Sequence, residues 1–115
     1  MPHAVIECSE NLAPMLRKEY ICQKAFAAMD KSGLFVANDI KVRLHVASDS
    51  YVGTKGPEGS FIHTIIYLME GRTVQQKQQL GASMCEHLKQ IAPQIDSLTV
   101  DVRELNKDLY QKANV

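Results

Sequence analysis

The sequence lacks an excess of either charge, because 13 lysine and arginine residues balance 13 aspartate and glutamate residues. A surface that follows the phosphates of a nucleic acid normally needs a basic excess, so we expect no nucleic-acid partner. Tryptophan is also absent, while hydrophobic residues make up 45% of the 115 positions and charged residues 23%. This composition is typical of a soluble globular protein, and the length fits one domain with one hydrophobic core.

Long hydrophobic runs are missing as well, since none approaches the ~18 residues of a membrane span. The first residues, MPHAVIEC, lack the basic-then-apolar pattern of a secretory signal. Cysteine is scarce: Cys8, Cys22 and Cys85 are odd in number and widely spaced, which argues against a disulfide framework and a zinc site. The four histidines show no ligand spacing either. We therefore expect a cytoplasmic protein with no membrane partner and no metal.

The periodicity of the apolar residues predicts four strands and two helices. The expected elements are, in order, a strand over 3–8, a helix that starts at 11–14 and ends at 32–33, a strand over 40–46, a strand over 61–69, a helix from 73 to 93, and a strand over 98–103. Thr73 and Gln76 form a predicted capping box at the start of the second helix.

Each predicted helix has an apolar stripe that should pack into the core. In the first helix, Met15, Cys22, Phe26 and Met29 fall at helical spacing. In the second helix, the corresponding positions are Leu80, Met84, Leu88 and Ile91.

The two halves of the chain repeat the same strand-helix-strand order. The halves cover 2–48 and 61–104, are offset by about 58 residues and are joined by loop 49–60, which suggests an internal duplication within one domain, 1–115. We expect an α/β (α+β) fold in which two β-α-β units form a four-stranded sheet with two helices on one face. Strand 61–69 is apolar on both faces, so the uncovered sheet face should become the interface of a homotrimer.

Pro2 is the candidate catalytic residue. Removal of Met1 would give Pro2 a free secondary amine, which can act as a base. If the first strands of the two halves pair antiparallel, Arg72 comes near Pro2 and Lys41 reaches the same end of the sheet. Two cations and apolar surroundings would lower the pKa of the amine towards neutrality. Arg72, at a helix start, could bind a carboxylate together with nearby backbone N–H groups.

Each of these residues also has a simpler interpretation. A proline at position 2 is compatible with a frayed terminus, and Lys41 and Arg72 are compatible with solvated surface charges.

A further set of residues carries a family resemblance. The set consists of Pro2-His3, Glu7-Cys8-Ser9, Asn11, Ile40, Arg43, His45, Phe61, His63, Gly71-Arg72 and Gln78-Gln79. In these residues, and over about 2–104, the sequence resembles the 5-carboxymethyl-2-hydroxymuconate isomerase family of the tautomerase superfamily.

The resemblance implies a homotrimer without metal or cofactor. It implies that Pro2 shuttles a proton while a 2-hydroxymuconate-type dienol becomes its 2-oxo-enoate in aromatic compound catabolism. It implies that Arg72 binds the substrate, a small dicarboxylate or tricarboxylate. Lys41 stands where a family enzyme carries another active-site arginine, and Arg43, two residues further along the same strand face, is a candidate for part of that role. Two alternatives stay open: a tautomerase acting on another keto-acid or dicarboxylate, and a catalytically inactive trimeric protein that binds a small ligand.

Overall fold

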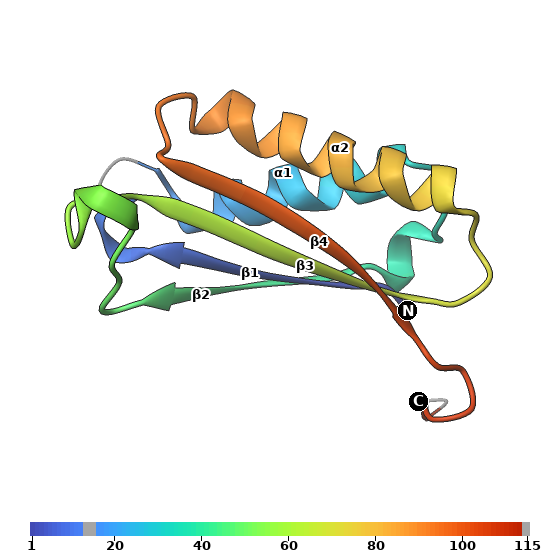
Figure 1. The fold of residues 1–115 in the computed structure, drawn as a ribbon. Coiled ribbons are helices and arrows are strands. Elements are labelled where there is room, and N and C mark those ends of the chain that lie inside the picture. Colours follow the sequence, from blue (N-terminus) through green and yellow to red (C-terminus); the bar gives the residue numbers. More distant parts are fainter. Residues whose placement is uncertain (13–15, 114–115) are drawn as a thin grey trace.

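The structure, a computed structural model, describes residues 1–12 and 16–113 (Figure 1). Within these residues the strands are β1 (His3–Ser9), β2 (Lys41–Ala47), β3 (Phe61–Met69) and β4 (Ser97–Leu105), and the helices are α1 (Lys18–Lys31) and α2 (Val74–Ile91). Short 3₁₀ turns cover Glu10–Leu12, Ala37–Asp39 and Gly53–Lys55.

The strands form one mixed sheet in the order β2-β1-β3-β4. β1 and β3 pair antiparallel at its centre, and each pairs in parallel with the second strand of its own half, β2 or β4. Parallel neighbours need a crossover, which α1 and α2 supply. Both helices lie on the same side of the sheet (Figure 1). The predicted class is confirmed, with two β-α-β units, four strands and two helices on one face.

The hydrophobic core fills the space between the sheet and the helices. Alternate residues of β1 and β3 are buried, so one face of each strand packs against the helices. The buried side chains include Ala4, Ile6, Cys8, Ile62, Ile66, Leu68, Leu80, Met84 and Leu88. The stripe predicted for α2 is therefore confirmed, since its fourth member, Ile91, packs against this core. No helix in the described residues is long and apolar enough to cross a membrane.

The predicted capping box at the start of α2 is present. The backbone N–H of Gln76 donates to Thr73 Oγ1 at 3.1 Å, and the backbone N–H of Thr73 donates to Gln76 Oε1 at 2.9 Å. Together these bonds satisfy two backbone donors that a helix start leaves free, and α2 begins where the sequence predicts.

The prediction for α1 is right at its end, at 32–33, and in the burial of Met29, but wrong in its start and in the burial of Cys22 and Phe26. The helix begins at Lys18; of the expected start, Asn11 and Leu12 lie in a 3₁₀ turn, while residues 13–15, including Met15 of the expected stripe, lie outside the described residues. The buried residues of α1 are Ile21, Ala25, Ala28 and Met29. Cys22 is only partly buried and Phe26 is 37% exposed. Two of the buried positions are alanines. The predicted stripe was drawn through larger apolar side chains and therefore ran along a different side of the helix.

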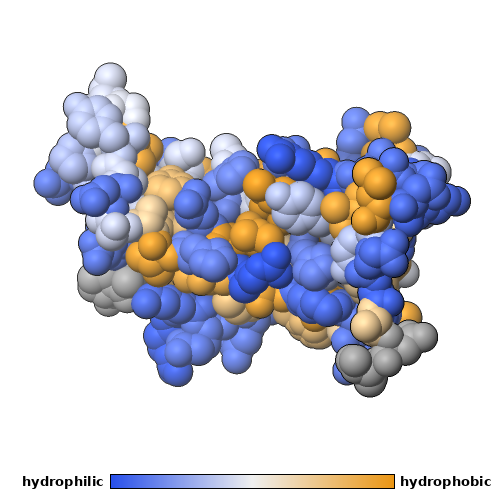
Figure 2. Space-filling model, turned by 90° about the horizontal axis from the view of Figure 1, so that it is seen from below, coloured by the Kyte–Doolittle hydropathy of each residue, from blue (hydrophilic) through white to orange (hydrophobic). Residues whose placement is uncertain are grey.

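The other face of the sheet carries no helix in the described part of the chain, and we call it the open face. It presents His3, Val5 and Glu7 of β1, Lys41, Arg43 and His45 of β2, Phe61, His63, Ile65, Tyr67 and Met69 of β3, and Thr99, Asp101 and Arg103 of β4. Figure 2 views the molecule from this side and shows hydrophobic surface interspersed with polar side chains. The apolar positions come mainly from β3, as the sequence predicts, whereas the neighbouring strands add charged groups.

Thr64 provides a test of the core. Its hydroxyl is fully buried, and Oγ1 has no hydrogen-bond partner among the described residues. A buried hydroxyl without a partner loses its hydration without compensation. We predict that Thr64→Val raises the free energy of unfolding by about 1 kcal/mol, measured by denaturant unfolding at one protein concentration. Thr54→Val, at an exposed position, is the control and should change stability by less than about 0.5 kcal/mol. A less stable Thr64→Val protein would contradict the prediction.

Candidate active site

Pro2 and Arg72 lie in one pocket at the end of the sheet where β1 and β2 begin and β3 ends, which we call the Pro2 end. The antiparallel register, with His3 opposite Tyr67, brings the start of β1 beside the end of β3. The pocket has a volume of about 250 Å³. Its lining includes Pro2, Arg72, Asp39 and the apolar segment 34–36. The proximity predicted from the sequence for Pro2 and Arg72 is therefore present.

Three contacts hold the guanidinium of Arg72 in place. Nη2 donates to the carbonyl oxygen of Leu34 at 2.8 Å, and Nη1 donates to that of Met69 at 3.4 Å. The guanidinium carbon also lies 5.2 Å from the centre of the Phe35 ring, a cation–π geometry. A guanidinium has five N–H donors, so this arrangement leaves donors free to bind a carboxylate.

Two of the backbone N–H groups at the start of α2 already have hydrogen-bond partners. Those of Thr73 and Gln76 are both used in the capping box. A carboxylate beside Arg72 therefore depends on the guanidinium more than on these two helix donors.

Lys41 lies at the Pro2 end, as predicted, but its ammonium group has a local partner. Its backbone N–H donates to the carbonyl oxygen of Pro2 at 3.1 Å, so the two residues are neighbours across the β1–β2 pair. Its Nζ donates to the carbonyl oxygen of Asp39 at 2.7 Å. The side chain is exposed and leaves the strand on the open face.

Arg43 lies further along the open face and does not line the pocket. Its Nη1 is 3.3 Å from His3 Nδ1, and His3 Nε2 is 3.0 Å from the hydroxyl of Tyr110. Because a guanidinium only donates, Nδ1 accepts and Nε2 carries the proton in this arrangement. Burial of His3, followed by the charges of Arg43 and Lys41, lowers the pKa of the imidazole. Tyr110 thus connects the C-terminal segment to β1, a contact that the sequence does not predict.

The N-terminal amine at this position lies in a desolvated and mainly cationic environment. The Met1 nitrogen donates to the carbonyl oxygen of Asp39 at 3.1 Å and lies 3.9 Å from Asp39 Oδ2. Burial is the largest cause that lowers the pKa of this amine, and the charges of Lys41, Lys112 and Arg72 act in the same direction, whereas Asp39 raises it. The Met1 amine is thus more readily deprotonated than a free terminus in water.

Sequence reasoning missed Asp39 and Phe35. Both lie in the segment between α1 and β2, which has no helical or strand periodicity. The position of Asp39 in the sequence was a usable signal. When β1 and β2 are parallel, residues at the start of β2 or just before it must lie near the beginning of β1.

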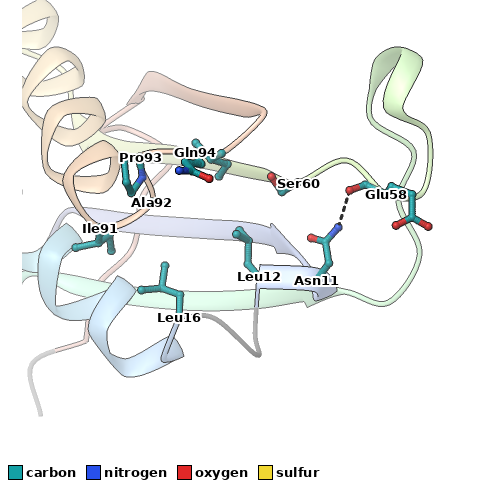
Figure 3. A pocket seen from close by; sticks show the side chains of 10 residues that line it. Asn11, Leu12, Leu16, Glu58, Ser60, Ile91, Ala92, Pro93 and Gln94 are labelled. Atoms are coloured by element: carbon teal, nitrogen blue, oxygen red, sulfur yellow. Dashed lines mark hydrogen bonds between the residues drawn. The ribbon is translucent and has the colours of Figure 1, made fainter.

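A second pocket, of about 500 Å³, lies at the opposite end of β1 (Figure 3). Asn11 Nδ2 donates to the carbonyl oxygens of Glu58 at 3.3 Å and Gly59 at 2.9 Å, and Asn11 Oδ1 accepts from Ser9 Oγ at 2.6 Å. These bonds attach loop 49–60 to the end of β1, which gives Ser9 and Asn11 a structural role. Among the described residues that line this pocket, Glu58 is the one ionisable side chain. The pocket therefore offers no acid–base pair. No group of three or more potential metal ligands gathers within the described residues.

Comparisons with a family model and with a curated protein point to the same family. The family model for 5-carboxymethyl-2-hydroxymuconate isomerase matches residues 2–115. The 5-carboxymethyl-2-hydroxymuconate Delta-isomerase of Escherichia coli is 23% identical over 119 residues, which cover 99% of this chain and 94% of that protein.

Two solved structures illustrate the likeness in fold. One is a 5-carboxymethyl-2-hydroxymuconate isomerase from Deinococcus radiodurans R1, with a TM-score of 0.86, 21% identity and coverage of 99% of this chain and 90% of that one. The other is a fused 4-OT symmetric trimer, with a TM-score of 0.78, 17% identity and coverage of 97% and 92%. At these identities the structures establish the fold alone.

Arg72 can be tested by substitution. We predict that Arg72→Ala lowers kcat/KM of the isomerase for a substrate with a carboxylate by about ten- to a hundredfold, as expected for the loss of one charge-assisted hydrogen bond worth ~1.5–3 kcal/mol. Arg72→Lys should restore only part of the activity, because lysine lacks the planar fork. Arg17→Ala removes a cation whose side chain is 86% exposed and should leave kcat/KM unchanged. An Arg72→Ala protein with unchanged kcat/KM would remove Arg72 from the site.

Proposed function

Because the chain belongs to the 5-carboxymethyl-2-hydroxymuconate isomerase family, we propose that it converts a 2-hydroxymuconate-type dienol, such as 5-carboxymethyl-2-hydroxymuconate, to its 2-oxo-enoate. In this proposal Met1 is removed and Pro2 is the catalytic base. The reaction needs no cofactor and belongs to aromatic compound catabolism in the cytoplasm. Residues 1–115 form one domain, with halves 2–48 and 61–104.

The observation that carries the proposal is that Pro2 and Arg72 line the same pocket. The unprotonated Pro2 nitrogen takes the proton of the 2-hydroxyl group and then delivers a proton to the far carbon of the diene. The C2–O bond becomes a carbonyl and the carbon–carbon double bonds shift, so the product is an isomer of the substrate. Arg72 binds a substrate carboxylate and orients the dienol towards the amine.

The surroundings of the pocket support this chemistry. Leu34, Phe35, Val36 and Leu68 line it together with Pro2 and provide an apolar wall. Apolar walls disfavour a charged amine and strengthen the interaction of Arg72 with a carboxylate, because both effects grow as water is excluded.

Lys41 and Arg43 are proposed as further substrate-binding residues. Lys41 supplies a second cation at the Pro2 end, although a lysine cannot form the bidentate contact of an arginine. Its ammonium group is bonded to the Asp39 carbonyl oxygen, which favours the alternative of another keto-acid or dicarboxylate as substrate. Arg43 would reach a bound ligand only from the open face, where it contacts His3.

A catalytically inactive ligand-binding protein is the other alternative. It is favoured if Met1 is retained, because the Pro2 nitrogen is then an amide and the Met1 amine occupies the position beside Asp39.

A homotrimer is part of the proposal, supported by the mixed open face and by relatives whose solved structures are described as trimers. We predict that sedimentation equilibrium at micromolar concentration gives three times the chain mass of 12.9 kDa. Ile65→Asp, which places a charge on β3 in the open face, should shift the protein towards monomer. Val74→Asp, at an exposed position of α2, is the matched control. A wild-type monomer would contradict the prediction.

The role of Pro2 can be tested by blocking its nitrogen. A protein with a retained Met1, or with a glycine placed ahead of Pro2, should lose about a hundredfold or more in kcat/KM, because an amide nitrogen is not a base. In the unblocked protein, kcat/KM should rise with pH and then level off, since the base must be unprotonated. The midpoint should lie below the pKa of a proline amine in a peptide, because burial and nearby cations lower the pKa of an amine at this end.

The assay follows the ultraviolet absorbance of the dienol, with the N-terminus of each protein verified by intact mass. Full activity in a protein with a confirmed block would show that Pro2 is not the base.

A further inference from the structure

Asp39 contributes a carboxylate to the pocket that holds Pro2 and Arg72, and it is the one acidic side chain among the described residues that line it. It is the last residue of the 3₁₀ turn Ala37–Asp39. Its backbone N–H donates to the carbonyl oxygen of Val36 at 2.9 Å, and the next residue, Ile40, donates to that of Ala37 at 3.2 Å. The turn therefore holds Asp39 in a defined place at the Pro2 end.

Asp39 faces the N-terminal amine with two groups. Its carbonyl oxygen accepts a hydrogen bond from the Met1 nitrogen, and its Oδ2 lies 3.9 Å from that nitrogen. Three covalent bonds separate the Met1 nitrogen from the Pro2 nitrogen, which limits their separation to ~3.7 Å. The Asp39 carboxylate thus lies within ~8 Å of the Pro2 nitrogen, about the distance over which salt screens charges at physiological ionic strength.

The other charged groups around this amine are all cationic. They are Lys41 from β2, Lys112 from the C-terminal segment, and Arg72 from the connection between β3 and α2. Each lowers the pKa of the N-terminal amine, as burial does, and Asp39 alone among these groups raises it. Removal of the Asp39 charge would therefore leave the cations unopposed.

We infer that Asp39 is a further functional residue of this site, a carboxylate that pairs electrostatically with the Pro2 amine and selects against substrate carboxylates on its side of the pocket. Arg72 attracts one substrate carboxylate, whereas a carboxylate placed beside Asp39 meets a like charge. The position of each carboxylate in the pocket therefore decides the effect. The substrate part of this inference rests on the proposed function. The pairing with the amine needs only the removal of Met1 and can be measured without substrate.

The first experiment measures the pKa of the Pro2 amine by NMR titration of protein labelled in proline, with Met1 removal confirmed by mass. Asp39→Asn should lower this pKa by about 0.5 or more, because it removes the charge that stabilises the protonated amine. Asp39→Glu keeps the charge and should retain most of the wild-type value. Asp49→Asn, an exposed position beyond the far end of β2, makes the same change in charge and should have no effect. An unchanged pKa in Asp39→Asn would overturn the pairing.

The second experiment compares dienols that carry one and two carboxylates. Asp39→Asn should raise kcat/KM for the dicarboxylate relative to the monocarboxylate by about threefold or more, and the acid limb of its pH profile should move to lower pH by the same amount as the amine pKa. An unchanged ratio would overturn the selection by charge.

If the wild-type protein turns over no dienol, the proposed function fails by itself. In that case, calorimetry measures the binding of the one- and two-carboxylate compounds to the wild-type protein and to Asp39→Asn. The ratio of the two affinities then tests the selection by charge, and the NMR titration tests the pairing with the amine as before.

Discussion

The antiparallel pairing of β1 with β3 is the constraint on which the rest of the structure depends. It joins the two β-α-β halves, and by setting the start of β1 beside the end of β3 it creates the pocket at the Pro2 end. The register is held by the buried alternation on both strands, such as Ile6 opposite Thr64 and Ala4 opposite Ile66. A slip of one residue would turn these side chains to the open face, so the hydrophobic core and the geometry of the pocket are maintained by the same contacts.

The electrostatics around the N-terminal amine follow from how the nearby charges are held. Arg72 is fixed by two carbonyl oxygens and by the Phe35 ring, and Lys41 is bonded to the Asp39 backbone. Such contacts keep the cations close to the N-terminal amine while leaving donor capacity for a ligand. Asp39 moderates their combined effect. The protonation state of the amine therefore depends on the balance between burial, several cations and one carboxylate.

The residues that carry the family resemblance serve two different purposes. Pro2 and Arg72 meet in the pocket, whereas Ser9 and Asn11 attach loop 49–60 to the far end of β1. The family model spans almost the whole chain even though a curated member is only 23% identical. A fold of this kind tolerates such divergence because it depends on the pattern of buried positions, which many apolar side chains can satisfy.

Local patterns in the amino-acid sequence are enough to predict some features of this structure. They predicted β3 from Phe61 to Met69 and the capping box of α2. With antiparallel pairing of the two first strands as a further condition, they also predicted that Pro2 and Arg72 lie close together. Other features follow only from the folded arrangement: the buried face of α1, the partner of the Lys41 ammonium group, the position of Asp39 in the pocket and the contact of Tyr110 with His3. Local periodicity reports which side of an element is apolar, but these features depend on contacts between segments that are distant in the sequence or that follow no period.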